Sequence, residues 1–268
     1  MARLGRRARA KRTKHIVLGT GLFLFVAAVA AGAAYFALSR PKPLNALNMC
    51  PAAGPAGHYV VLLDKTDPLT FTQKAALEVF VKELIEKRVP EGSLVSVFAL
   101  GSDYKQNAEP VVELCNPGTG AGKDETTSNP RKLRERYEQQ FAQPLKAQID
   151  KLIAIESSKT SPIFEMLQLV AINGFRKNAI QGEHRLIVIS DMLHNTDELS
   201  MFKQQFDFAA FHDSAYGKRT QVDLQGVSVE LHYLMNYPQI QTRRNAGFWE
   251  SYFEHAGARV VDVRPVEG

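Results

Sequence analysis

Two aspartates close the two most apolar runs of the chain. Asp64 ends HYVVLLD (58–64), and Asp191 ends LIVISD (186–191). Two hydroxyl-bearing residues could complete a site with these aspartates. Thr66 follows the first aspartate, and Ser161 belongs to KTSP (159–162). Carboxylates and hydroxyls are hard oxygen ligands that suit Mg²⁺ or Ca²⁺ better than zinc. For either aspartate alone, capping of the following helix is the simpler interpretation, but the combination favours a cation site.

The loop after the first run also resembles a different kind of site. The sequence DKTDPLT (64–70) is similar to the DKTGTLT of haloacid-dehalogenase-like phosphotransferases, with Asp67 and Pro68 in place of Gly and Thr. That resemblance would make Asp64 a nucleophile that forms an aspartyl phosphate. A helix is expected within about six residues of Asp64, where those enzymes insert a turn and flap. The next acidic residues after Asp191 are Asp197 and Glu198, so a close carboxylate pair is lacking, and we keep this enzyme as the less favoured alternative.

Apolar periodicity alternates along the chain between strand and helix patterns. We expect strands at 58–64, 93–101, 110–115, 184–191, 227–235 and 258–263, and helices at 70–89, 131–157, 161–176, near 197–212 and at 244–257. This alternation predicts a doubly wound α/β fold with a mostly parallel central sheet flanked by helices. In such sheets ligands bind at the carboxyl ends of the strands, so Asp64 and Asp191 would share one rim.

The order of these motifs over about residues 57–264 resembles a von Willebrand factor A (vWA) domain. The resemblance implies a metal-ion-dependent adhesion site formed here by Asp64, Thr66, Ser161 and Asp191. It implies a non-enzymatic module without catalytic residues, which binds a protein partner with the help of Mg²⁺ or Ca²⁺. Pro68 replaces the last serine of the family's first loop and offers no hydroxyl, although Asp67 could substitute for it. A metal-free structural scaffold therefore stands as the alternative.

The N-terminal region predicts attachment to a membrane. Seven lysines and arginines lie in residues 3–14, which exceeds the formal net charge of +5 and leaves the rest of the chain at −2. No basic face for nucleic acid is implied. Residues 16–38 carry no charge, and these 23 residues would form a helix of about 34 Å, enough to cross a bilayer. A cleavable signal peptide ending near AGA (31–33) is the alternative, but its apolar core would be shorter.

These features divide the chain into four parts. We expect a basic cytoplasmic arm (1–15), a transmembrane helix (16–38), a Pro/Gly-rich linker (39–57) and a vWA-like domain (58–268). Basic residues before the span place the N-terminus in the cytoplasm. The domain would then be periplasmic, attached to the inner membrane of a bacterium, with protein partners at the same membrane. In that oxidising compartment Cys50 and Cys115 can form a disulfide, the alternative being two unpaired thiols.

Overall fold

The computed structural model describes residues 6–38, 43–122, 128–153, 158–204 and 206–268. The first element is the helix α1 (Arg6–Leu38). Its segment Val17–Tyr35 is long and apolar enough to cross a membrane, and none of it is buried in the protein. The described residues from Pro43 onward, apart from Gly122, Ser128 and Asn129, belong to a separate compact unit.

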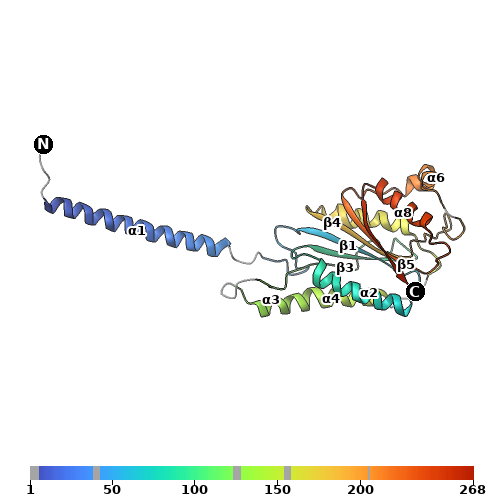
Figure 1. The fold of residues 1–268 in the computed structure, drawn as a ribbon, viewed down its shortest axis with the longest axis horizontal. Helices are drawn as coiled ribbons and strands as arrows, with labels where there is room; N and C mark the ends of the chain where they lie inside the picture. Colours follow the sequence, from blue (N-terminus) through green and yellow to red (C-terminus); the bar gives the residue numbers. More distant parts are fainter. Residues whose placement is uncertain (1–5, 39–42, 123–127, 154–157, 205) are drawn as a thin grey trace. The chain divides into compact units, whose positions relative to one another are not determined.

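A six-stranded sheet forms the centre of that unit (Figure 1). Its order is β3-β2-β1-β4-β5-β6, and all neighbours are parallel except β2 and β3. The strands are β1 (Gly57–Asp64), β2 (Leu94–Leu100), β3 (Val112–Cys115), β4 (Glu183–Ser190), β5 (Val227–Met235) and β6 (Arg259–Glu267). The mostly parallel, doubly wound fold predicted from the sequence is confirmed. β1 and β4 are adjacent strands in the centre of the sheet. The carboxyl end of β1, at Asp64, therefore lies beside the carboxyl end of β4, which directly precedes Asp191.

Helices cover both faces of the sheet. One side carries α2 (Phe71–Glu83), α3 (Pro130–Tyr137) and α4 (Gln143–Ile153), and the other carries α8 (Arg243–His255) (Figure 1). The remaining helices are α5 (Ile163–Leu169), α6 (Phe208–Asp213) and α7 (Ala215–Arg219). Short π-helical segments continue α2 to Arg88, join α3 to α4, and continue α5 to Arg176.

Each face of the sheet has its own hydrophobic core. On one face the strands pack against α5, α6 and α8 around Phe164 and Trp249. On the other face they pack against α2 and α4 around Leu77, Phe141 and Leu145. The aromatic residues of α8 are therefore core residues. Because β1 and β2 are buried along their whole length, their sequences are continuous apolar runs instead of alternating ones.

The structure differs from the expected elements in three places. The helix expected near 197–212 is wrong: Asn195 forms an isolated bridge with Ser200, and α6 begins only after Asp207, whose carboxylate accepts from two amides of its first turn. The expected helix at 131–157 is two helices joined by a π-helical segment, and its end (154–157) lies outside the described residues. The last strand runs to Glu267, because a proline such as Pro265 is tolerated in an edge strand.

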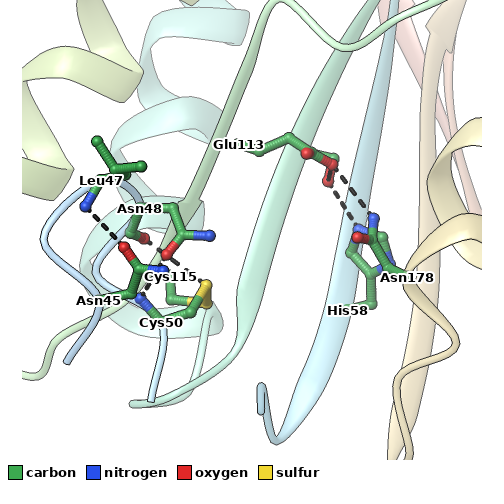
Figure 2. The surroundings of a disulfide bond; sticks show 9 residues. Asn45, Leu47, Asn48, Cys50, His58, Glu113, Cys115 and Asn178 are labelled. Atoms are coloured by element: carbon green, nitrogen blue, oxygen red, sulfur yellow. Dashed lines mark hydrogen bonds between the residues drawn. A yellow bond between two sulfur atoms is a disulfide. The ribbon is translucent and has the colours of Figure 1, made fainter. Parts of the chain in front are cut away.

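A disulfide attaches the segment before β1 to the edge of the sheet. Cys50 and Cys115 are bonded, with their Cα atoms 4.7 Å apart (Figure 2). The amide of Cys115 also donates to the carbonyl of Asn48 at 2.8 Å. Part of the expected linker is therefore ordered against the domain from Pro43 onward, whereas residues 39–42 lie outside the described residues.

Candidate functional site

The carboxylate of Asp64 lies at the end of β1 and is surrounded by hydroxyl groups. Its Oδ1 accepts from the amide of Thr66 at 2.9 Å and from Thr66 Oγ1 at 2.6 Å. Its Oδ2 accepts from Ser190 Oγ at 2.6 Å and lies 3.5 Å from Ser161 Oγ. Segments 97 and 126 residues away in the chain thus meet one carboxylate, because β1 and β4 are neighbours in the sheet.

Asp191 follows β4 in a tightly held turn. Its Oδ1 accepts from the amide of Leu193 at 2.8 Å, whereas its Oδ2 is buried and has no partner within the described part of the chain. The next residue, Met192, has a φ of 56°, a left-handed conformation that is strained for a methionine. Two side chains hold this turn: Trp249 Nε1 donates to the carbonyl of Met192 at 2.7 Å, and Gln241 Nε2 donates to that of Asp191 at 2.9 Å.

Ser161 is positioned by the loop that follows Asp191. Ser161 and Asn195 exchange two backbone hydrogen bonds, at 2.8 and 3.0 Å. Two residues after Ser161, the amide of Ile163 at the start of α5 donates to His194 Nδ1 at 3.1 Å. The loop before α5 and the loop after β4 are therefore one connected structure, which places Ser161 beside Asp64.

Electrostatics at this rim disfavour two free negative charges. Burial raises the pKa of Asp64, and the hydrogen bonds from Ser190 and Thr66 oppose that rise. Burial also raises the pKa of Asp191 well above its usual range, and the nearby charges of Asp64 and Asp67 raise it further. Both carboxylates are at most 5% exposed. Two buried carboxylates at close quarters need a shared proton or a cation.

A cleft of about 260 Å³ opens beside Thr66 and Ser161, and neither Asp64 nor Asp191 is among its lining residues. Its lining includes Thr66, Asp67, Lys159, Phe202 and Tyr237. The Tyr237 hydroxyl donates to Asp67 Oδ1 at 3.4 Å, and its ring meets that of Phe202 edge to face at 5.0 Å. The cleft is thus a polar opening with one aromatic wall, through which a partner group can approach Thr66 and Ser161.

The residues present fit a divalent cation in part. The orphaned Asp191 Oδ2 is a buried carboxyl oxygen without a hydrogen-bond partner among the described residues, which is the kind of group that a hard cation would satisfy. Thr66 and Ser161 add hydroxyls next to Asp64. The described residues hold no group of three or more His, Cys, Asp or Glu side chains arranged for a metal. Any cation here would therefore depend on hydroxyls and on two aspartates.

The sequence pattern singled out Asp64, Thr66, Ser161 and Asp191. The structure places these four residues close together, at the carboxyl ends of β1 and β4. It missed Ser190, which makes the shortest contact of Asp64 Oδ2. The available signal was its position directly before Asp191 at the end of an apolar run. Pro68 is exposed and supplies no hydroxyl, while Asp67 faces the cleft.

Comparison with known proteins gives a fold-level likeness only. No protein-family model and no curated protein sequence matches the chain. Similar solved structures include an aerotolerance-related membrane protein from Bacteroides fragilis (10% identity, 77% of this chain and 90% of that chain, TM-score 0.35). They also include the conserved hypothetical protein BatB from Bacteroides thetaiotaomicron (12% identity, 79% and 90%, TM-score 0.35) and the human COPII-coat protein Sec24c (10% identity, 80% and 30%, TM-score 0.36).

Likeness at these TM-scores is too weak to bear on function, so the architecture is judged from the strand order and the helix layers. The sheet has the order 3-2-1-4-5-6. Its mostly parallel strands and the helices on both faces are the features expected from the sequence motifs. The chain carries a doubly wound α/β domain preceded by one apolar helix.

Proposed function

We propose that this chain is a membrane-anchored interaction module that binds a protein partner at the rim formed by Asp64, Thr66, Ser161 and Asp191. A divalent cation, Mg²⁺ or Ca²⁺, would be held there by the two aspartates and the two hydroxyls, directly or through water. The single observation that carries the proposal is the orphaned, buried Asp191 Oδ2 beside a second buried carboxylate. Such a pair without a counter-charge is costly for a merely structural feature.

The proposed placement follows from the N-terminal region. The α1 segment Val17–Tyr35 would be an uncleaved anchor, with the basic arm in the cytoplasm and the vWA-like domain in the periplasm. The partner would be a protein at the same membrane. Nucleic acid is not the expected partner, because positive charge is concentrated in the arm before the span.

Two alternatives stand beside this proposal. In a metal-free scaffold the aspartates would share a proton, and Pro68 would mark the loss of the metal site. In a phosphotransferase Asp64 would attack phosphorus, but both of its oxygens accept hydrogen bonds and α2 begins at Phe71, which leaves little chain for an inserted flap. The geometry therefore favours a binding role over a nucleophilic role for Asp64.

Thermal unfolding of the full chain in detergent, with and without Mg²⁺, Mn²⁺ or Ca²⁺, tests the cation. A ligand at 100 times its dissociation constant stabilises by about 2.7 kcal/mol, which raises the Tm of a domain of this size by roughly 5–10 °C. Asp64→Asn keeps the shape of the side chain and should abolish the rise. Pro68→Ser restores a hydroxyl and should enlarge the rise, with Pro68→Ala as its matched control.

Each outcome separates the candidates. A rise that Asp64→Asn abolishes supports the cation site. No rise with any metal at millimolar concentration would contradict it and favour the scaffold. Turnover of a panel of phosphate esters that disappears in Asp64→Asn would instead establish the phosphotransferase.

A further inference from the structure

The last strand of the sheet has a free edge. β6 pairs only with β5, and none of the described strands pairs with its outer side. Most of its residues are exposed, including Val261 at 38% and Val263 at 47%. Unpaired backbone groups along a long, exposed edge strand form a template for another strand.

The opposite edge of the sheet differs in this respect. β3 has four residues, and the segment that contains Asn48 and Cys50 is bonded to its end by a hydrogen bond and a disulfide. β6 has nine residues, and none of the described strands or disulfides covers its outer side, although near its end Gln73 Nε2 donates to the carbonyl of Val266 at 3.4 Å. Of the two edges, β6 is therefore the one that can accept a further strand.

The charges of β6 are complementary to those of the same strand reversed. The strand reads RVVDVRPVE, so that positive residues stand at 259 and 264 and negative residues at 262 and 267. Reversal about Val263 places Asp262 opposite Arg264 and Arg259 opposite Glu267. All four side chains then face an opposite charge, and Val263 faces its own copy.

We infer that β6 docks on β6 of a second copy of this chain, antiparallel and in the register centred on Val263. Two sheets would join into one continuous sheet across a two-fold axis through Val263. Asp262 of each copy would pair with Arg264 of the other, in addition to the 2.6 Å contact from Arg264 Nε to Asp262 Oδ2 that each copy makes within itself. The exposed valines at the axis would be buried on each other.

The charge pattern also disfavours neighbouring registers. A shift that centres the pairing on Asp262 or on Arg264 would place like charges directly opposite each other, which is destabilising. Two features limit the strength of the contact: Pro265 has no amide hydrogen to donate, and Val261 is the extra residue of a bulge between Val260 and Asp262. The pairing therefore centres on residues 262–264, and a reversible dimer is the expected product.

Disulfide crosslinking of engineered cysteines tests the register directly. Cys50 and Cys115, the two cysteines of the chain, are bonded to each other, so one added cysteine is the only free thiol. In the proposed register the Cα atoms of two Val263→Cys residues would lie about 4.5–5.5 Å apart, within the range of a disulfide. Val261→Cys is the matched control, because its two copies would lie roughly 13 Å apart.

The expected result, for the full chain in detergent under mild oxidation, is a crosslinked dimer from Val263→Cys and little from Val261→Cys. Equal crosslinking of both variants would overturn the register. Sedimentation equilibrium of the unmodified chain, read alongside, should show a concentration-dependent dimer. A monomer at every concentration, with no crosslink, would overturn the proposal.

A charge exchange distinguishes this interface from association through any other surface. Asp262→Arg and Arg264→Asp each turn two attractive pairs into repulsive ones, and each should weaken the dimer about tenfold. The double variant Asp262→Arg/Arg264→Asp restores opposite charges and should recover most of the affinity. A dimer that none of these variants affects would assign the association to another part of the chain, or to another partner strand, and would overturn the proposal.

Discussion

Glu230 is a buried charge on the sheet. It lies in β5, its side chain is 1% exposed, and it receives hydrogen bonds from Arg88 and His232. Arg185 of β4 and Arg264 of β6 lie within 4.0 Å. Burial alone would raise the pKa of Glu230, but the hydrogen bonds and positive charges outweigh it and lower the pKa to about 2.

This arrangement predicts a defined pH dependence of stability. Because the folded-state pKa is below the unfolded value, Glu230 stabilises the fold above about pH 4.5, and that stabilisation is lost as pH falls toward 2. Glu230→Gln should lower the free energy of unfolding at pH 7 by about 2–3 kcal/mol. Its difference from the unmodified chain should shrink steadily below pH 4.5, which denaturant titrations at several pH values would measure.

The exposed Glu250, on α8, provides the control. Glu250→Gln should leave stability within about 0.5 kcal/mol at every pH. A difference between Glu230→Gln and the unmodified chain that stays constant from pH 7 to pH 2 would show that shape and packing, and not charge, account for the effect.

At the candidate site, residue types were predictable and their exact contacts were not. Asp64 and Asp191 were found because each ends an apolar run, and strand ends meet at a rim. Ser190 was missed although it directly precedes Asp191, because a serine at the end of an apolar run does not by itself indicate that its hydroxyl faces the rim. The missing partner of Asp191 Oδ2 depends on the left-handed turn at Met192, which no residue-type pattern indicates.

The segment from Pro43 to Ala56 is an element without regular structure that depends on its bonds to the domain. Besides the disulfide, the amide of Ala56 donates to the carbonyl of Gly92, and the side chain of Asn48 accepts from the amide of Cys50. Figure 2 shows Asn48 and Cys50 beside Cys115, at the end of β3. Cys50, Leu94, Cys115 and Ile180 form a small core of their own there.

Loss of the disulfide should therefore cost substantial stability. Closing a loop of 65 residues stabilises by about 4 kcal/mol in the chain-entropy model. Reduction of the purified chain should lower its Tm markedly, and the variant Cys50→Ser/Cys115→Ser should show the lower Tm with or without reductant. Differential scanning calorimetry measures both. Equal Tm values before and after reduction of the unmodified chain would contradict the prediction.

Element types followed from periodicity where burial was complete. The strand at 227–235 and the helix at 244–257 agree with β5 and α8 to within two residues. The region 197–212 was wrong because its apolar residues, Met201, Phe206 and Phe211, pack into the core from turns and a short helix instead of one long face. Local periodicity cannot distinguish these cases, since tertiary contacts decide between them.

At the scale of the whole molecule, the proposed orientation makes a prediction about the disulfide. If the domain is periplasmic, its two cysteines should be bonded in the cell. Acid-quenched cells treated with a thiol-reactive polymer should show no added mass until the sample is reduced, and then two additions per chain. The same blot should show an uncleaved N-terminal helix by its length.

Neutralisation of the seven arm residues supplies the control for orientation. Without these charges the positive-inside preference is removed, so part of the population should keep the domain in the cytoplasm with reduced thiols. Labelling of both thiols in the unmodified chain before reduction would contradict the periplasmic placement.

The disulfide also determines how the domain would carry a mechanical load. Tension applied between the membrane end of the chain and the C-terminal half would pass from Cys50 through the sulfur bridge to Cys115. Residues 51–114, which include β1, α2 and β2, lie inside the covalent loop and would bear none of that tension. Asp64 and Thr66 belong to this shielded stretch, whereas Ser161, Ser190 and Asp191 lie outside it. A pull would therefore act on only one half of the rim and would tend to separate β4 from a β1 that stays unstretched.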